Sequence, residues 1–342
     1  MKRVMIAVAL SVSAASCALG PNYQRPAVAT PPAFRDVAPA AAPAGPESLA
    51  DVQWFDLFKD DTLTQLVRTA LAQNFDLRIA AERVLQARER FRIVGADRLP
   101  VVVGTAAASS NRVSEVGPRP LPAALGPDVA DVQIGFALAW ELDVWGRLRR
   151  LNEAARAQYL ATEEARHAVV TTLVADVTDA YFLLQTLDRQ LVIAERTRDV
   201  AADGLRLTRL RRERGVATAL DTSQAEQLLY TATAQIASVQ RQLAQTEDEL
   251  SVLVGRTPGD VARSGAFIDT FNARPAVPVG LPSALLERRP DIRQAEQALI
   301  AANAQIGVAR AEYFPRIALT GFLGLESRDL TTLLSAPART AA

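Results

Sequence analysis

The fold is decided by the stretch Leu173–Ala194, which reads LVADVTDAYFLLQTLDRQLVIA. Its apolar and small residues recur at alternating steps of four and three, which is the spacing of a coiled-coil seam. The seam residues are Leu173, Val177, Ala180, Leu184, Leu187, Leu191 and Ala194. Residues 147–214 around this stretch contain no proline, so we predict one continuous helix of about 100 Å.

A second helical pattern begins after Gly215 and extends to Val254. It keeps a strict heptad of apolar and small residues, again with the spacing of a coiled-coil seam. Its members are Ala225, Leu229, Ala232, Ile236, Val239, Leu243, Thr246, Leu250 and Leu253. Because a short turn joins two helices that both carry seams, the sequence predicts a long helical hairpin over residues 147–254.

Alternating segments on both sides of this hairpin predict β-strands. Between Val132 and Trp140 every second residue is apolar and the others are small or polar, and a similar alternation follows Pro315. We therefore predict strands at about 99–110 and 129–141, with a third strand after Pro315.

The apolar face of these strands bears on the fold class. A strand of roughly ten residues with one apolar face is typical of a membrane β-barrel, although a soluble β-sandwich shows the same alternation. The long helices between the strands favour the barrel. Three strands cannot close a barrel, and an open sheet edge cannot face lipid, so other chains are expected to complete the sheet. The predicted fold class is thus mainly α with membrane β.

An internal repeat at an offset of 215 residues organises the chain. Aligning Asp76–Thr105 with Asp291–Thr320 gives seven identities in thirty positions, and both copies are heptad helices that lead into a proline. This pattern predicts duplication of a large unit. We assign residues 54–290 to the first repeat and residues 291–342, with a helix and one strand, to an incomplete second repeat.

The N-terminus has the layout of a secretory signal. A short basic start is followed by an apolar segment, and residues 1–16 end in small residues before Cys17. The sequence Ala-Ala-Ser-Cys at this point is similar to a bacterial lipobox, so we expect Cys17 to carry the lipid; ordinary signal cleavage near Ala15 is the alternative. Residues 17–53, rich in proline and alanine, are predicted to form an extended linker.

Composition argues against several classes of function. Lys+Arg and Asp+Glu both number 38, so no basic excess points to nucleic acid. The chain has one cysteine and one histidine, which excludes a His/Cys metal cluster or an internal disulfide within one chain. His167 lies in a helical stretch without a nucleophile motif beside it. We predict no catalytic residue, no cofactor and no enzyme activity.

Several short motifs, in order along the chain, resemble the lipoprotein branch of the TolC-like outer membrane factors, which serve resistance-nodulation-division efflux pumps. The resemblance covers the chain from Cys17 to about Ser327. The motifs are CALGPNYQRP at Cys17–Pro26, WELDVWGR at Trp140–Arg147, VGLPS at Val279–Ser283, RRPD at Arg288–Asp291, and FPRI with LTG between Phe314 and Gly321.

This resemblance implies a homotrimer in the outer membrane. Each chain of such a trimer gives strands to one shared β-barrel and long helices to one periplasmic tunnel, through which drugs or other small solutes leave. A periplasmic adaptor, an inner-membrane pump and outer membrane lipid are the implied partners. The family's second repeat continues into a further strand and hairpin that carry its acidic gate residues, so the sequence up to Ala342 resembles a C-terminally truncated copy and gives no gate. A non-functional or interfering fragment, and a periplasmic adaptor-type lipoprotein, are the alternatives.

The turn between the two long helices is the candidate docking site. By resemblance it lies at the periplasmic tip that meets the adaptor, and its own residue types also fit a glycine C-cap followed by a threonine N-cap. Its residues are Arg211, Arg212, Arg214, Gly215, Val216, Ala217 and Thr218. Trp140 and Trp145 are expected either to anchor at the membrane interface or to be buried where strand meets helix.

Overall fold

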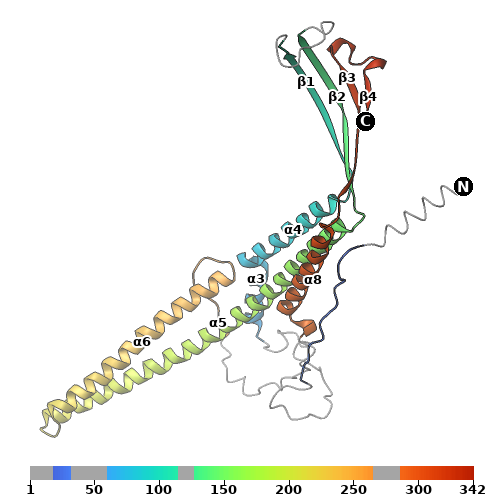
Figure 1. Cartoon of the computed structure of the whole chain (residues 1–342). Helices are drawn as coiled ribbons and strands as arrows, with labels where there is room; N and C mark the ends of the chain where they lie inside the picture. The colour runs from blue at the N-terminus through green and yellow to red at the C-terminus, as the bar shows by residue number, and fades with distance from the viewer. Residues whose placement is uncertain (1–17, 32–59, 115–126, 265–285) are drawn as a thin grey trace. The chain divides into compact units, whose positions relative to one another are not determined.

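The computed structural model describes residues 18–31, 60–114, 127–264 and 286–342 (Figure 1). The predicted signal sequence, Cys17 and residues 32–53 of the predicted linker lie outside these ranges. The chain divides into two compact units. The first comprises Met1–Ala27, Leu85–Ala161 and Ala295–Ala342, and the second comprises Val28–Val84 and Thr162–Gln294.

The second unit is built around the helical hairpin. Helix α5 (Arg147–Glu213) and helix α6 (Ala219–Leu253) lie side by side, with a short turn between them (Figure 1). Helix α3 (Asp61–Gln73) and the start of α4 (Phe75–Ala96) pack onto the same core. The core residues are Leu63, Val67, Ala70, Leu77, Leu173, Val177, Ala180, Tyr181, Leu184, Leu187, Val239, Leu243, Leu250, Val254 and Val261. Most of the predicted seam residues are therefore buried.

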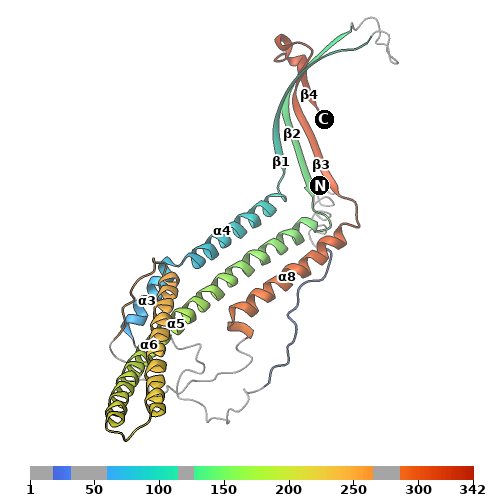
Figure 2. The same cartoon turned by 90° about the vertical axis from the view of Figure 1, so that its left-hand side faces the viewer.

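The first unit carries an antiparallel sheet of four strands in the order β1-β2-β3-β4, which Figure 2 shows side by side. Strands β1 (Val101–Arg112), β2 (Asp128–Leu142) and β3 (Ile317–Ser327) are long, and β3 follows helix α8 (Pro290–Ala311). Strand β1 begins two residues later than predicted because Pro100 has no N–H to give to the ladder.

The register places the apolar residues of the sheet on one face. Phe136 of β2 lies opposite Gly104 of β1 and opposite Leu323 of β3, and residues that lie opposite each other share a face. Its neighbours Ile134 and Leu138 along β2 point the same way, because side chains alternate along a strand. One face of the sheet therefore carries mostly apolar and small residues across three strands, with Gly104 and Gly321 among them, as the alternation in the sequence predicts.

The prediction of one strand in residues 291–342 is wrong. A second strand, β4 (Arg339–Ala341), pairs with Leu323–Leu325, after two short 3₁₀ turns at Leu330–Thr332 and Ala336–Ala338 reverse the chain. The sequence Arg-Thr-Ala is too short to show alternation. It forms a strand because its backbone N–H and C=O groups meet the unpaired edge of β3, a long-range contact that local propensity does not encode.

Candidate functional sites at the strand-to-helix joint and the hairpin tip

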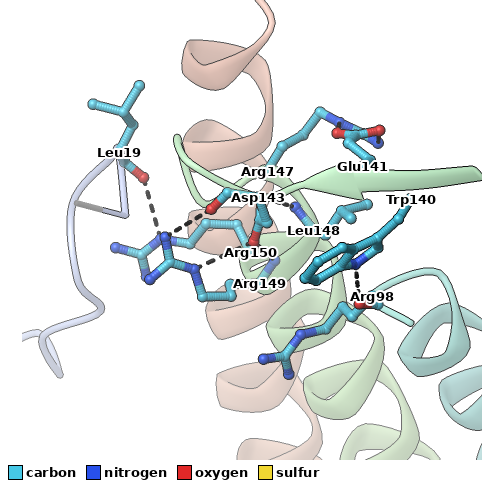
Figure 3. A network of polar contacts seen from close by, with 9 residues as sticks. All are labelled: Leu19, Arg98, Trp140, Glu141, Asp143, Arg147, Leu148, Arg149 and Arg150. Atoms are coloured by element: carbon cyan, nitrogen blue, oxygen red, sulfur yellow. Dashed lines mark hydrogen bonds and ion pairs between the residues drawn. The ribbon is translucent and has the colours of Figure 1, made fainter. Parts of the chain in front are cut away.

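The joint between β2 and α5 is organised by one carboxylate (Figure 3). Asp143 Oδ1 accepts the backbone N–H of Leu148 at 2.9 Å, and its Oδ2 accepts the backbone N–H of Arg149 at 2.9 Å. These are two of the donors that the first turn of any helix leaves without an intrahelical partner. Gly146, at φ +78, turns the chain into the helix, and its carbonyl accepts the N–H of Arg150. The negative charge also complements the positive end of the α5 dipole.

Two arginines hold the same turn through ion pairs (Figure 3). Arg147 makes a bidentate contact with Glu141, with Nε–Oε1 at 3.0 Å and Nη2–Oε2 at 2.8 Å. This hydrogen bonding to Glu141 raises the pKa of the Arg147 guanidinium. Arg149 Nε lies 3.2 Å from Asp143 Oδ2, so the end of β2 and the start of α5 are fastened to each other twice.

Two tryptophans tie the other strands to this joint. Trp140 Nε1 donates to the carbonyl of Arg98 just before β1, and Trp145 Nε1 donates to the carbonyl of Pro315 just before β3. The Trp145 ring also stacks on Phe314, with ring centroids 4.7 Å apart. Both indoles are half-buried and both N–H groups are satisfied, so a structural role at the joint is confirmed. Anchoring at a membrane interface stays a prediction.

The tip of the hairpin is a tightly hydrogen-bonded turn. Gly215, at φ +76, donates to the carbonyl of Arg212, and Val216 donates to the carbonyl of Arg211, which is the Schellman arrangement at a helix end. Thr218 then begins α6 with a capping box. Its hydroxyl oxygen accepts the N–H of Asp221, and Asp221 Oδ2 accepts the N–H of Thr218 at 2.7 Å. The N–H and the hydroxyl of Thr218 both donate to Asp221 Oδ2, and these two hydrogen bonds lower the pKa of Asp221.

The side chains of the tip are exposed and positively charged. Arg211, Arg212 and Arg214 are exposed, and none forms an ion pair with the residues that the structure describes. Beside them Val216 is 76% exposed. The capping interpretation is therefore correct for the backbone, and the capping hydrogen bonds do not use the exposed arginine side chains of the tip.

One part of the joint is not predicted by any pattern named above. Residues 18–25, included in the predicted linker, lie against α5 and α8, and Leu19 donates its N–H to the carbonyl of Trp145 at 3.1 Å. We name Ala18–Arg25 the N-terminal clasp. The signal in the sequence is Gly307, because a glycine inside a predicted helix often marks a close backbone approach, and Gly20 of the clasp makes that approach here.

Comparisons with known proteins agree on one family. Residues 66–256 and 281–341 match the model of the outer membrane efflux protein family. The chain is 37% identical over 327 residues to the solvent efflux pump outer membrane protein SrpC of Pseudomonas putida, covering 93% of this chain and 67% of that protein. It is 34% identical over 337 residues to the cation efflux system protein CusC of Escherichia coli, covering 98% of this chain and 70% of that protein.

Comparison of the fold with solved structures indicates the same family. The solved structure of the MtrE outer membrane channel of Neisseria gonorrhoeae superposes with a TM-score of 0.80 at 29% identity, covering 95% of this chain and 71% of that one. The predicted fold class is confirmed by these matches. The chain therefore belongs to the outer membrane efflux protein family and is an outer membrane channel component of an efflux system.

Proposed function

We propose that this chain is one subunit of a homotrimeric duct through which drugs or other small solutes leave the cell chemically unchanged. A periplasmic adaptor connects the duct to an inner-membrane pump, which supplies the energy. SrpC belongs to a solvent efflux pump and CusC to a cation efflux system, which supports small solutes as the cargo. Because a duct only conducts its solutes, it needs no catalytic group, and we propose no catalysis for this chain.

The observation that carries this proposal is the exposed apolar face of the sheet. Phe136 is 63% exposed, Leu323 is 67% exposed and Val102 is 62% exposed, although all three are large apolar residues. Lipid is the environment in which such a face is stable. Strands β1 and β4 are the two edges of the sheet, and backbone groups at an edge cannot remain unpaired in a bilayer. Copies of the same chain supply the missing neighbours.

An arginine at Phe136 tests the membrane face. At mid-bilayer depth the change costs about 2–4 kcal/mol per subunit, so we expect at least tenfold less crosslinked trimer in outer membrane fractions. Thr105→Arg is the matched control, because Thr105 lies opposite Gly135 on the other face of the sheet. Its trimer yield is expected to match the unsubstituted chain. Equal yields from both arginine variants would show that the apolar face does not contact lipid.

We place the lipid anchor on Cys17, the only cysteine of the chain. The next residue, Ala18, packs against the joint so closely that a Cβ on Gly146 would lie 2.7 Å from its Cα atom. Ala18, the residue to which Cys17 is joined, thus lies at the joint that follows β2. Acylation and the sheet then engage the same outer membrane lipid.

The hairpin tip is proposed as the surface that binds the adaptor. Three exposed arginines, which form no ion pair within the described ranges, and the exposed Val216 form a small, positively charged end held by the Schellman turn and the capping box. Cations at the C-terminal end of α5 also stabilise the helix dipole, which is a modest effect at exposed positions. A binding partner with acidic groups opposite Arg211 and Arg212 accounts for the excess of charge.

Charge reversal tests this surface. We expect Arg211→Glu/Arg212→Glu to reduce crosslinking from a photoreactive residue at Val216 to the co-expressed adaptor of the same system at least tenfold. The control is Arg196→Glu/Arg241→Glu, which changes the net charge equally on exposed positions; Arg196 lies about 22 Å from Arg211 along α5. Crosslinking that survives the tip reversal, or that the control lowers equally, would reject docking through these arginines.

A further inference from the structure

Side chains of α5 and α8 donate hydrogen bonds to the N-terminal clasp, mostly to its backbone carbonyls. Arg150 Nε donates to the carbonyl of Leu19 at 3.2 Å, and its Nη2 donates to the carbonyl of Gly20 at 3.2 Å and to Asn22 Oδ1 at 2.7 Å. From α8, Asn303 Nδ2 donates to the carbonyl of Pro21 at 2.9 Å. Four consecutive clasp residues thus each meet a directed donor.

Arg150, the central donor, carries a buried positive charge. The side chain of Arg150 is 6% exposed, and its Nη1 pairs with Glu153 at 2.7 Å. Its Nε and Nη2 groups donate to the clasp. Without the clasp these buried donors would lack acceptors, which would cost free energy in a site shielded from water. We call the residues of α5 and α8 that contact the clasp, which are Arg150, Glu296, Asn303 and Gly307, its groove.

Shape adds selectivity to this hydrogen bonding. Gly20 has φ +93, and a Cβ built on it would lie 2.5 Å from the Cα atom of Gly307 in α8. A Cβ on Gly307 would lie 2.7 Å from the carbonyl oxygen of Leu19 and 2.8 Å from Cγ of Arg150. Both backbones must be glycine for this approach, so the groove accepts only glycine at the position of Gly20.

The far end of the clasp is recognised through its side chains. Tyr23 donates its hydroxyl to Glu296 Oε1 at 3.2 Å, and Arg25 Nη2 donates to Glu296 Oε2 at 3.0 Å. Burial, together with the hydrogen bond to Glu296, raises the pKa of Tyr23. One carboxylate on α8 thus selects a tyrosine and an arginine two positions apart.

We propose that the groove between α5 and α8 is a sequence-specific peptide-binding site, and that the clasp is its separable ligand, bound in cis. The ligand is an extended segment of the form Leu-Gly-Pro-Asn-Tyr-Gln-Arg. Covalent attachment gives the clasp an effective concentration on the order of millimolar, so a free copy of the segment binds only where the attached one has been displaced. A second copy of this chain carries the same N-terminal segment, which enters the groove only where the resident clasp has been displaced.

Displacement of the clasp tests the site in the full-length chain. Gly20→Val places a branched side chain against Gly307 and releases the clasp. We expect a fluorescent peptide of residues 18–27, ALGPNYQRPA, to bind this variant saturably by anisotropy, at least tenfold more tightly than the unsubstituted chain. Gly204→Val is the matched control: its Cβ would meet nothing within 4 Å, so the clasp stays in place and binding stays weak.

Two further arms make the result decisive. A peptide with valine in place of its glycine is expected to lose binding to the Gly20→Val chain, and so is the native peptide on a Gly20→Val/Gly307→Val chain. If Gly20→Val fails to fold, Tyr23→Ala/Arg25→Ala loosens the clasp without adding bulk and is expected to raise peptide binding in the same way. Equal binding to all chains, or no binding to a folded chain with a displaced clasp, would overturn the proposal.

Discussion

Replacing Gly255 with alanine is expected to destabilise the chain far more than the same change at Gly215. The two glycines occupy the same position after a helix, with φ +74 and φ +76. Gly255 donates to the carbonyl of Val252 and Arg256 donates to that of Ser251, which repeats the pattern at the hairpin tip. The backbone strain imposed by a Cβ is therefore alike at both sites, about 1–2 kcal/mol.

The surroundings of the two glycines differ. A Cβ on Gly215 would meet nothing within 4 Å, whereas a Cβ on Gly255 would lie 2.5 Å from the carbonyl oxygen of Gln73 at the end of α3. That backbone cannot move freely, because the next residue, Asn74, donates its Nδ2 to the carbonyl of Leu253 at 3.0 Å. A methyl group at Gly255 must push α3 and α6 apart.

The expected difference is large enough to measure directly. Overpacking and a weakened buried hydrogen bond bring the cost at Gly255 to about 3–5 kcal/mol, against about 1–2 kcal/mol at Gly215. We expect thermal unfolding in detergent, followed by circular dichroism at one scan rate, to give a clearly lower midpoint for Gly255→Ala. Equal midpoints for the two variants would mean that contact with α3 contributes nothing to the fold.

The helical hairpin could be predicted from sequence because its evidence is local. Every turn of residues 173–194 repeats the same seam, and Gly215 beside Thr218 marks the turn with two independent caps. The alternation in Val132–Trp140 is equally local, because side chains on a strand change face at each residue. Periodic patterns of this kind can be recognised without knowing how the rest of the chain folds.

Several contacts within each unit could not be predicted, because they join residues far apart in sequence. The clasp has no period, and its partner Arg150 lies 131 positions from Leu19. Strand β4 is too short to carry a pattern. Asp60 and Ser264 meet across 204 positions, and neither belongs to a motif. Each of these groups is placed by predicted helices or by the edge of the predicted strand β3, and not by its own local sequence.

Tyr181 is the residue whose loss is expected to damage the second unit most. Its side chain is fully buried, and its hydroxyl donates to Asp60 Oδ2 at 2.9 Å while accepting the N–H of Ser264 at 3.2 Å. Ser264 Oγ donates to the same carboxylate oxygen at 2.8 Å. Asp60 in turn accepts the N–H of Leu63 and so caps α3. One phenol thereby joins α5, the start of α3 and the segment after α6.

Tyr181→Ala removes both the ring and this junction. The cavity costs about 3–5 kcal/mol and the lost polar contacts about 1–3 kcal/mol, so we expect a total of roughly 4–8 kcal/mol. Tyr181→Phe keeps the ring and isolates the polar part, at about 1–3 kcal/mol. Tyr230, 66% exposed on α6, is the matched control, and its replacement by alanine or phenylalanine is expected to change stability by less than about 0.5 kcal/mol.

The pH dependence of stability distinguishes the contact of the Tyr181 hydroxyl with the Asp60 carboxylate from its contacts with Ser264. Burial raises the pKa of Asp60, but hydrogen bonds from Leu63, Ser264 and Tyr181 outweigh it and hold this pKa below its ordinary value of 3.8. A carboxylate whose pKa is lowered by folding stabilises the fold above its unfolded pKa, and this contribution is lost as pH falls through the folded pKa.

Tyr181→Phe removes one of those hydrogen bonds, so the folded pKa of Asp60 moves back toward 3.8 and the carboxylate contributes less. The stability gap between the unsubstituted chain and Tyr181→Phe is therefore expected to stay constant from neutral pH to about pH 5 and to narrow below about pH 4. Denaturant midpoints measured across this range report it. A gap that persists unchanged to pH 3 would show that the Tyr181 hydroxyl stabilises the chain through its contacts with Ser264 and not through the ionised carboxylate of Asp60.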